Sequence, residues 1–254
     1  MQPTPLVTQL AYRYNAAMIC RPFNCIFIHI PKAAGRSVEM FFLEKLGLDR
    51  DNDADRQQLL IVDNDDPAKG TEKLSHLSAT EYVQCGHITQ QEFSSFYKFS
   101  FVRNPWARLV SEYRYRNFLS HKSFKDFVMN KLPPPGRDDK YRHVMPQTEM
   151  LYDNNGSLLV DFVGKFETLQ QDFDQVCKRL GFEDSRLPHV NSSDKKSREL
   201  RRKARNFLYR NGESNLRNYV DFYDSESREI VTDLYRADIE NFGYSFSDAM
   251  KTRV

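Results

Sequence analysis

Short apolar runs alternate with longer segments of helical periodicity along the chain, and one such pair stands out near the start. Residues 26–30 (IFIHI) are β-branched or aromatic at most positions and are too short for a helix, so they predict a buried strand. Apolar residues then recur near helical spacing from Val38 to Leu46, and Gly47 supplies a stop signal. The pattern predicts a strand, a short loop and a helix.

The loop between this strand and helix is built from small and basic residues, in the sequence IPKAAGRS. Small residues let backbone N–H groups approach an anion at the positive end of the helix, so the loop is predicted to hold a phosphate. The frame departs from the GxxxxGK[ST] pattern of P-loop enzymes, because Ile30 replaces the first glycine and the lysine stands at the second loop position. That departure counts against an ATPase or a kinase.

A second strand-to-helix junction occurs in residues 98–116 (KFSFVRNPWARLVSEYRYR). Phe99 to Val102 predict a short buried strand, Arg103 follows at its carboxyl end, and Pro105 stands at the first position of a helix that carries Ser111. An arginine at such a switch points toward the crevice where open α/β sheets bind ligands. A guanidinium there suits a second, separate phosphate.

The remaining periodicity completes an α/β prediction, with a single P-loop-like domain over residues 1–254. A central, mainly parallel sheet is expected to be flanked by helices, and the C-terminal part to be helical. Residues 1–24 are expected to form an N-terminal extension, and the acidic residues 49–70 a polar surface insertion around a short apolar segment. Further predicted elements are a helix at 123–132, a strand at 158–166, a helix at 167–180 and a final helix at 225–242.

These motifs resemble those of carbohydrate sulfotransferases that use 3′-phosphoadenosine 5′-phosphosulfate (PAPS), of the heparan 2-O and chondroitin–dermatan type and their bacterial relatives. PKAAGRS is similar to their 5′-phosphosulfate loop, and FVRNPWARLVSEY to their 3′-phosphate motif. The resemblance extends through QCGH, RHVMPQ, DFVGKFETL, LPHVN and YRADIENFGY, and therefore covers the chain from about Cys25 to Tyr244.

The resemblance implies a role for each motif. The donor PAPS would be held by Lys32, Ala33, Ala34, Gly35, Arg36, Ser37, Arg103 and Ser111. Lys32 would stabilise the charge that develops on the leaving phosphate oxygen, because a flexible ammonium group can follow that oxygen. The reaction releases 3′-phosphoadenosine 5′-phosphate, and no metal is expected.

The acceptor hydroxyl needs a base, and the resemblance selects His87, whose ordinary pKa of about 6.5 leaves a neutral imidazole near neutral pH. A histidine satisfied by a backbone carbonyl is the alternative interpretation of His87. His29 is a rival base, since strand alternation allows it to face either the core or the cleft. His143 and Gln147 are expected to shape the acceptor or donor pocket. The other histidines, His76, His121 and His189, are interpreted as surface or loop residues.

Composition agrees with an enzyme that does not bind nucleic acid broadly, because the formal net charge of the 254 residues is only +2. The four cysteines are widely spaced, as in a reduced cytosolic protein. No signal peptide or membrane span is evident. We therefore expect a cytoplasmic bacterial enzyme, with a truncated Golgi lumenal domain as the alternative.

Three functions remain open from the sequence. A PAPS-dependent sulfotransferase acting on a carbohydrate or another hydroxyl acceptor leads, ahead of a P-loop nucleotide kinase and a catalytically inactive nucleotide- or glycan-binding module. The basic residues 191–205 are either a solvated face or a contact to donor or polyanionic acceptor. Neither the acceptor nor the oligomeric state follows from the sequence.

Overall fold

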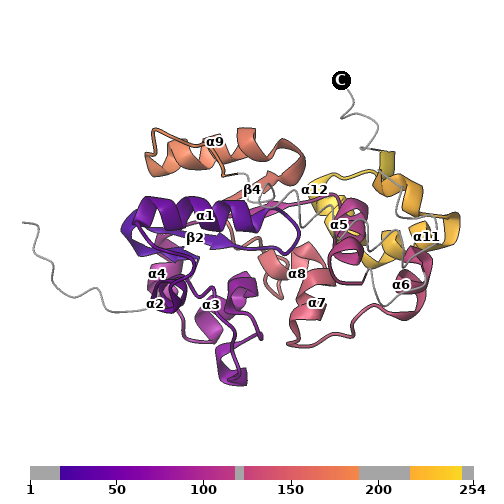
Figure 1. Ribbon diagram of the computed structural model, residues 1–254, viewed down its shortest axis with the longest axis horizontal. Helices are drawn as coiled ribbons and strands as arrows, with labels where there is room; N and C mark the ends of the chain where they lie inside the picture. Colours follow the sequence, from indigo (N-terminus) through magenta and orange to yellow (C-terminus); the bar gives the residue numbers. More distant parts are fainter. Residues whose placement is uncertain (1–17, 118–122, 189–217, 248–254) are drawn as a thin grey trace, which may run out of the picture.

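A four-stranded sheet forms the centre of the protein in the computed structural model, which describes residues 18–117, 123–188 and 218–247 (Figure 1). The strands stand in the order β1-β2-β3-β4; β1 is antiparallel to β2, and the other neighbours are parallel. They are β1 (Ile19–Cys20), β2 (Cys25–Ile28), β3 (Tyr97–Val102) and β4 (Phe162–Lys165). The predicted α/β class with a mainly parallel sheet is confirmed.

Aromatic residues set the register at the middle of the sheet. Phe27 on β2 pairs with Phe99 on β3, and Phe99 pairs in turn with Phe162 on β4. The rings of Phe27 and Phe99 lie 5.2 Å apart in a stacked arrangement. Because β2 is buried on both faces, its sequence is continuously apolar rather than alternating.

Helices cover both faces of the sheet. In Figure 1, α1 and α9 lie on one side of the strands and α3 on the other, while α5, α6, α11 and α12 gather beyond one end. Phe41 of α1 and Phe173 of α9 meet edge to face at 4.8 Å, and the hydroxyl of Tyr82 on α3 lies 3.5 Å from the Phe27 carbonyl oxygen. The helices are α1 (Gly35–Leu46), α2 (Asp53–Gln58), α3 (Ala79–Gln84), α4 (Gln90–Ser95), α5 (Pro105–Glu112), α6 (Phe124–Asn130), α7 (Asp139–Val144), α8 (Gln147–Leu151), α9 (Leu169–Leu180), α11 (Ser225–Leu234) and α12 (Arg236–Phe242).

Short 3-10 and π-helical turns lie between several of these elements. The one π-helical turn among the described residues, η4 (Tyr113–Asn117), follows α5 directly. The 3-10 turns are η1 (Arg21–Phe23), η2 (Pro67–Lys69), η3 (Leu74–His76), η5 (Phe166–Thr168) and η8 (Tyr219–Phe222).

Several predicted boundaries need correction. The strand predicted at 158–166 is confined to β4, because Leu158 instead bridges to Tyr152. The helix predicted at 225–242 is two helices that meet at Tyr235, whose buried hydroxyl donates a hydrogen bond to the Val144 carbonyl oxygen. The 3-10 turn η5 precedes α9, which shortens the helix predicted at 167–180.

The segment 49–70 is more than a surface insertion. Its acidic residues Asp51 and Asp53 are exposed, but Leu59, Leu60 and Ile61 are buried in the same core as the sheet. The Leu59 carbonyl oxygen also accepts a hydrogen bond from the Met18 N–H group at 3.0 Å. This apolar stretch therefore anchors the segment to the edge of the sheet.

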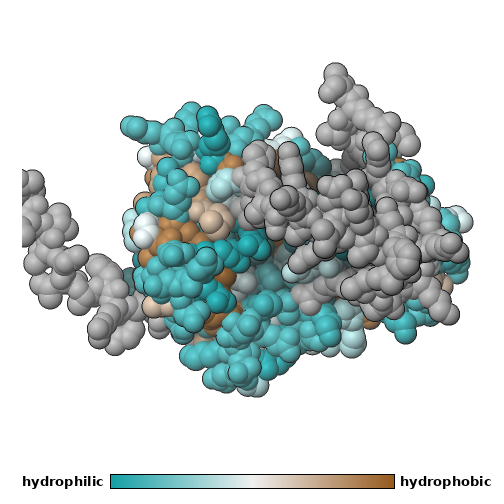
Figure 2. Space-filling model, viewed as in Figure 1, coloured by the Kyte–Doolittle hydropathy of each residue, from teal (hydrophilic) through white to brown (hydrophobic). Residues whose placement is uncertain are grey.

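The described surface is largely polar in the view of Figure 2, with hydrophobic side chains visible only in patches between hydrophilic ones. Within the described ranges, we find no helix that is both long and apolar enough to cross a lipid bilayer. The predicted residues His121, His189 and 191–205, and residues 1–17 of the predicted extension, lie outside the described part of the chain.

Candidate active site

The loop after β2 leads into α1 through a strained backbone. Lys32 and Ala34 both have a φ of 69°, a left-handed conformation that residues other than glycine seldom adopt. Ala34 is the N-cap of α1, and its side chain offers no oxygen to the first N–H groups of the helix. The start of α1 therefore presents backbone donors that suit an anion.

Gly35 is required because a histidine ring lies against it. A Cβ atom at position 35 would come within 1.9 Å of the Cδ2 and Nε2 atoms of His29. The His29 Nδ1 atom lies 2.8 Å from Glu39 Oε1 of α1, and Glu39 also pairs with Arg50 at 3.1 Å. His29 is thus a buried support of the loop, which settles the choice between core and cleft left open by strand alternation.

Glu39 is an ionised partner in this arrangement. Burial alone raises the pKa of its carboxyl group, but the nearby charges of His29 and Arg50 outweigh burial, so the pKa is lowered. A carboxylate is therefore held under the loop, one turn into α1.

Arg103 follows β3 and reaches the same loop. Its Nη1 atom donates to the Lys32 carbonyl oxygen at 3.1 Å, and its guanidinium carbon lies 4.1 Å from the centroid of the Phe166 ring. Burial lowers the pKa of Arg103 to about 10, and its buried Nε atom has no hydrogen-bond partner in the described structure. A desolvated guanidinium with an unused donor fits an anion site.

Gln147 holds the backbone of Arg103 rather than facing solvent. Its amide oxygen accepts from the Arg103 N–H group at 2.8 Å, and its amide nitrogen donates to the Arg103 carbonyl oxygen at 2.9 Å. The same nitrogen reaches Asp238, a buried carboxylate on α12 that also accepts from Thr148. Gln147 is fully buried, so its contacts in this structure orient Arg103.

A fully buried arginine, Arg108 on α5, ties the loop to α7. Its guanidinium donates to the carbonyl oxygens of Pro31, Met145 and Arg142 at 3.1, 2.9 and 3.4 Å. Sequence reasoning missed Arg108, because an arginine on an amphipathic helix is expected at the surface. The apolar neighbours Leu109 and Val110 were the only local signal.

The other predicted donor residues lie in the loop, in the first turn of α1 and near the end of α5. Ala33 is buried in the loop, Arg36 is exposed in the first turn of α1, and Ser37 is half-buried beside it. Ser111 is half-buried near the end of α5, eight residues along the chain from Arg103. The structure thus brings Lys32 and Arg103 into direct contact through the Lys32 carbonyl group.

His87 follows α3 and lies half-buried against a different loop. Its Nε2 atom lies 2.9 Å from the Lys69 carbonyl oxygen, and its backbone N–H donates to Tyr82. Since a carbonyl oxygen can only accept, Nε2 carries the proton and Nδ1 has the basic lone pair. Burial lowers the pKa of His87. Its described contacts are thus with the segments around it, and none of them is with residues 31–37.

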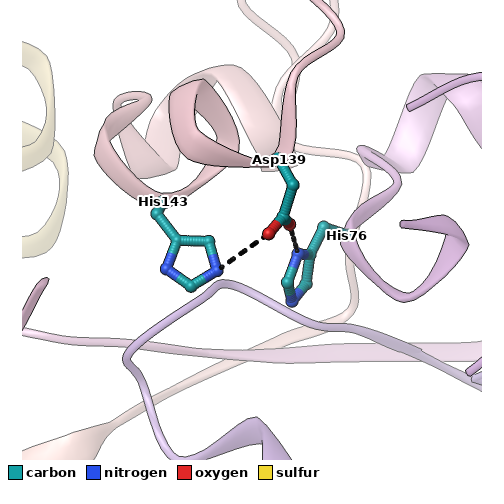
Figure 3. Close-up of side chains that lie close together, drawn as sticks. All are labelled: His76, Asp139 and His143. Atoms are coloured by element: carbon teal, nitrogen blue, oxygen red, sulfur yellow. Dashed lines mark hydrogen bonds and ion pairs between the residues drawn. The ribbon is translucent and has the colours of Figure 1, made fainter. Parts of the chain in front are cut away.

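A buried cluster of His76, Asp139 and His143 lies beneath the loop (Figure 3). His76 Nδ1 lies 2.6 Å from Asp139 Oδ1, and His143 Nε2 lies 3.7 Å from Asp139 Oδ2. The Nδ1 atom of His143 lies 2.6 Å from Glu112 of α5. The interpretation of His76 as a surface residue is wrong: it is 7 % exposed, and burial lowers its pKa to about 4.

The geometry of this cluster favours shared protons over a metal ion. Its three ligand atoms lie within 4.8 Å of one another, which is compact enough to surround a cation. However, ligand atoms bound at about 2.0–2.2 Å to one tetrahedral ion stand roughly 3.3 Å apart, whereas the 2.6 Å contact of His76 with Asp139 has the length of a hydrogen bond.

The three buried histidines form a row under the loop. The ring of His76 lies edge to face with His29 at 5.0 Å and with His143 at 5.2 Å. His143 in turn lies parallel to the ring of Tyr115 at 6.0 Å. The row therefore extends from Gly35, at one end of the loop, to Tyr115, which contacts Lys32 at the other.

A pocket of about 540 Å³ lies elsewhere, at the amino ends of the parallel strands. Tyr97 and Lys98, which begin β3, line it together with Arg179 and Asp161. Ligands of open α/β sheets bind at the carboxyl ends of the strands, where β2 delivers the loop and β3 delivers Arg103. This pocket is therefore separate from the candidate site.

Comparisons with known proteins identify the family of the chain. A family model described as "Sulfotransferase family" matches residues 15–245. An uncharacterized protein of the archaeon Archaeoglobus fulgidus is 31% identical over an alignment of 114 residues, which covers 42% of this chain and 85% of the archaeal one. No solved structure matches the chain. Because the family model covers nearly the whole chain, including both strand-to-helix junctions, the protein belongs to the sulfotransferase family.

Proposed function

We propose that the protein transfers the sulfuryl group of PAPS to an acceptor hydroxyl, and that the acceptor is a carbohydrate. The observation that carries this proposal is the contact between Arg103 and the Lys32 carbonyl group. It brings a half-buried guanidinium to a loop that opens a helix, so two anion-binding features stand side by side. A donor with phosphates on both the 3′ and the 5′ oxygen of one ribose fits that pair, whereas ATP carries its phosphates on the 5′ oxygen only.

Each part of the proposed donor site has a physical role. The backbone N–H groups at the start of α1, with Arg36 and Ser37, hold the 5′-phosphate. Arg103 and Ser111 hold the 3′-phosphate, and Gln147 contributes by fixing the Arg103 backbone. We assign no step to a metal ion.

The reaction is an in-line displacement at sulfur. The acceptor oxygen forms the new bond to sulfur while the bond from sulfur to the 5′-phosphate oxygen breaks, and the acceptor proton passes to a base. Lys32 stabilises the charge on the departing phosphate oxygen. His87 takes the proton on Nδ1, since Nε2 is already engaged with Lys69.

His87→Ala is expected to lower kcat by at least about 100-fold, the usual contribution of a general base, and to leave the affinity for 3′-phosphoadenosine 5′-phosphate unchanged. Because burial lowers the pKa of His87, the wild-type rate should stay high below the ordinary histidine value and fall only at more acidic pH. Steady-state rates across pH, with calorimetry of the bisphosphate, measure both effects. If the rate of His87→Ala falls at acidic pH as the wild-type rate does, His87 is not the base. A loss of bisphosphate affinity that parallels the loss of kcat would lead to the same conclusion.

Transfer of labelled sulfate from PAPS to a panel of saccharide, lipid and small-alcohol acceptors tests the function itself. Labelled saccharide products are the expected result. Release of phosphate from ATP that requires magnesium would support a nucleotide kinase instead. Tight binding of bisphosphate without transfer to any acceptor would support an inactive binding module.

A further inference from the structure

Lys32 and Tyr115 are distant in sequence and meet at the candidate site. The Lys32 Nζ atom lies 3.9 Å from the centroid of the Tyr115 ring. An ammonium group within about 6 Å of a ring face is attracted by its negative potential. Tyr115 belongs to the π-helical turn η4, a form of helix that is found frequently at functional sites.

The backbone conformation of Lys32 and its contact with Tyr115 together determine where the Lys32 side chain lies. With a φ of 69°, Lys32 is held in a conformation that costs free energy for a residue with a side chain. That conformation, together with the hydrogen bond from Arg103 to the Lys32 carbonyl group, fixes where the side chain leaves the loop. The ring of Tyr115 then determines where its flexible end lies.

The ring of Tyr115 is itself stacked on the ring of His143. It is inclined by only 13° to the ring of His143, with the centroids 6.0 Å apart. His143 is buried, and its Nδ1 atom is bonded to the buried carboxylate of Glu112 at 2.6 Å. Tyr115 is 66% exposed, so this support from His143 keeps an otherwise accessible ring in a defined orientation.

We propose that Tyr115 is a positioning residue for Lys32. Its ring keeps the ammonium group beside the loop, close to where the leaving phosphate oxygen develops negative charge. The inference rests on the proposed function, because that function gives Lys32 its role. The face of the ring carries the interaction, so phenylalanine should replace tyrosine and leucine should not.

The test compares Tyr115→Leu with Tyr115→Phe in the full chain. Tyr115→Leu should lower kcat about fivefold, the upper range for losing one cation–π contact at an exposed ring, while the affinity for 3′-phosphoadenosine 5′-phosphate changes less than about twofold. Tyr115→Phe should restore kcat to within about twofold of wild type. Tyr97→Leu is the matched control. The Arg179 guanidinium carbon lies 5.7 Å from the centroid of the Tyr97 ring, but Tyr97 begins β3 at the opposite end of the sheet.

Three results would overturn the inference. Wild-type turnover in Tyr115→Leu would show that Lys32 needs no ring. Equal losses in the leucine and phenylalanine variants would assign the effect to the hydroxyl group. A parallel loss of bisphosphate affinity in Tyr115→Leu would reduce Tyr115 to a structural support of the whole site.

Nuclear magnetic resonance of ¹³C-labelled lysine ε-carbons tests the contact without any turnover. The resonance that disappears in Lys32→Arg should be shifted upfield by the Tyr115 ring, should lose that shift in Tyr115→Leu and should keep it in Tyr115→Phe. An unshifted Lys32 resonance in the wild type would contradict the inference. If the wild type neither binds bisphosphate nor transfers sulfate, the proposed function fails and the positioning role fails with it; if both persist and Tyr115→Leu behaves as wild type, only the inference about Tyr115 fails.

Discussion

Arg103→Ala is expected to weaken binding of 3′-phosphoadenosine 5′-phosphate about 100-fold and to change binding of adenosine 5′-phosphosulfate far less. The guanidinium is half-buried and its Nε atom is shielded from solvent, so its bonds to a phosphate would be made in a reduced dielectric. Charge-assisted hydrogen bonds contribute about 1.5–3 kcal/mol each, and the forked geometry of arginine allows two to one phosphate. Isothermal titration of both ligands measures the difference.

Arg103→Lys and Arg21→Ala make this experiment specific. Lysine keeps the charge but cannot form the bidentate pair of hydrogen bonds. The bisphosphate affinity of Arg103→Lys should therefore lie between those of the wild type and the alanine variant. Arg21 forms a partly exposed ion pair with Glu92 next to the amino ends of the strands, and its replacement should leave binding unchanged. Equal losses for both ligands in Arg103→Ala would place Arg103 outside a 3′-phosphate site.

Gly35→Ala is expected to disrupt the loop, because the added Cβ atom would lie 1.9 Å from the His29 ring. The ring cannot retreat easily, since Glu39 stands 2.8 Å from its Nδ1 atom and His76 packs against it. Overpacking of this kind costs roughly 1–3 kcal/mol of stability, which for a chain of this size lowers the melting temperature by about 3–10 °C. Bisphosphate affinity should fall as well, because the first N–H groups of α1 would be displaced.

His29→Ala in the Gly35→Ala background should recover part of the lost melting temperature by making room for the methyl group. Gly136→Ala is the matched control, since a Cβ atom there meets nothing within 4 Å. Thermal unfolding of the single and double variants measures the coupling. A double variant no more stable than Gly35→Ala would mean that His29 is not what excludes a side chain at position 35.

Local patterns in the sequence were sufficient to predict the parts of the site that adjoin the strands. The apolar run before Lys32 and the run before Arg103 each form a strand, and Pro105 begins α5 with Asn104 as its cap. These predictions succeed because a strand end, a loop of small residues and a helix cap are specified by neighbouring residues.

The buried polar residues under the loop could not be predicted in the same way. His76 pairs with Asp139 sixty-three positions away, and His143 pairs with Glu112 thirty-one positions away. Periodicity assigns polar residues to the surface, and only the tertiary arrangement shows that each histidine has a carboxylate partner that offsets the cost of burial. The same reason explains why Arg108, bonded to three carbonyl groups, was missed.

Calorimetric titration of the whole chain with 3′-phosphoadenosine 5′-phosphate, adenosine 5′-monophosphate and ATP tests the central claim most directly. The claim is that the loop before α1 and the half-buried Arg103 bind two phosphates on one adenosine. We expect one site per chain, with an affinity for the bisphosphate at least about 100-fold above that for the monophosphate, or roughly 2.7 kcal/mol. Equal affinity for the bisphosphate and the monophosphate, or preference for ATP, would contradict the account.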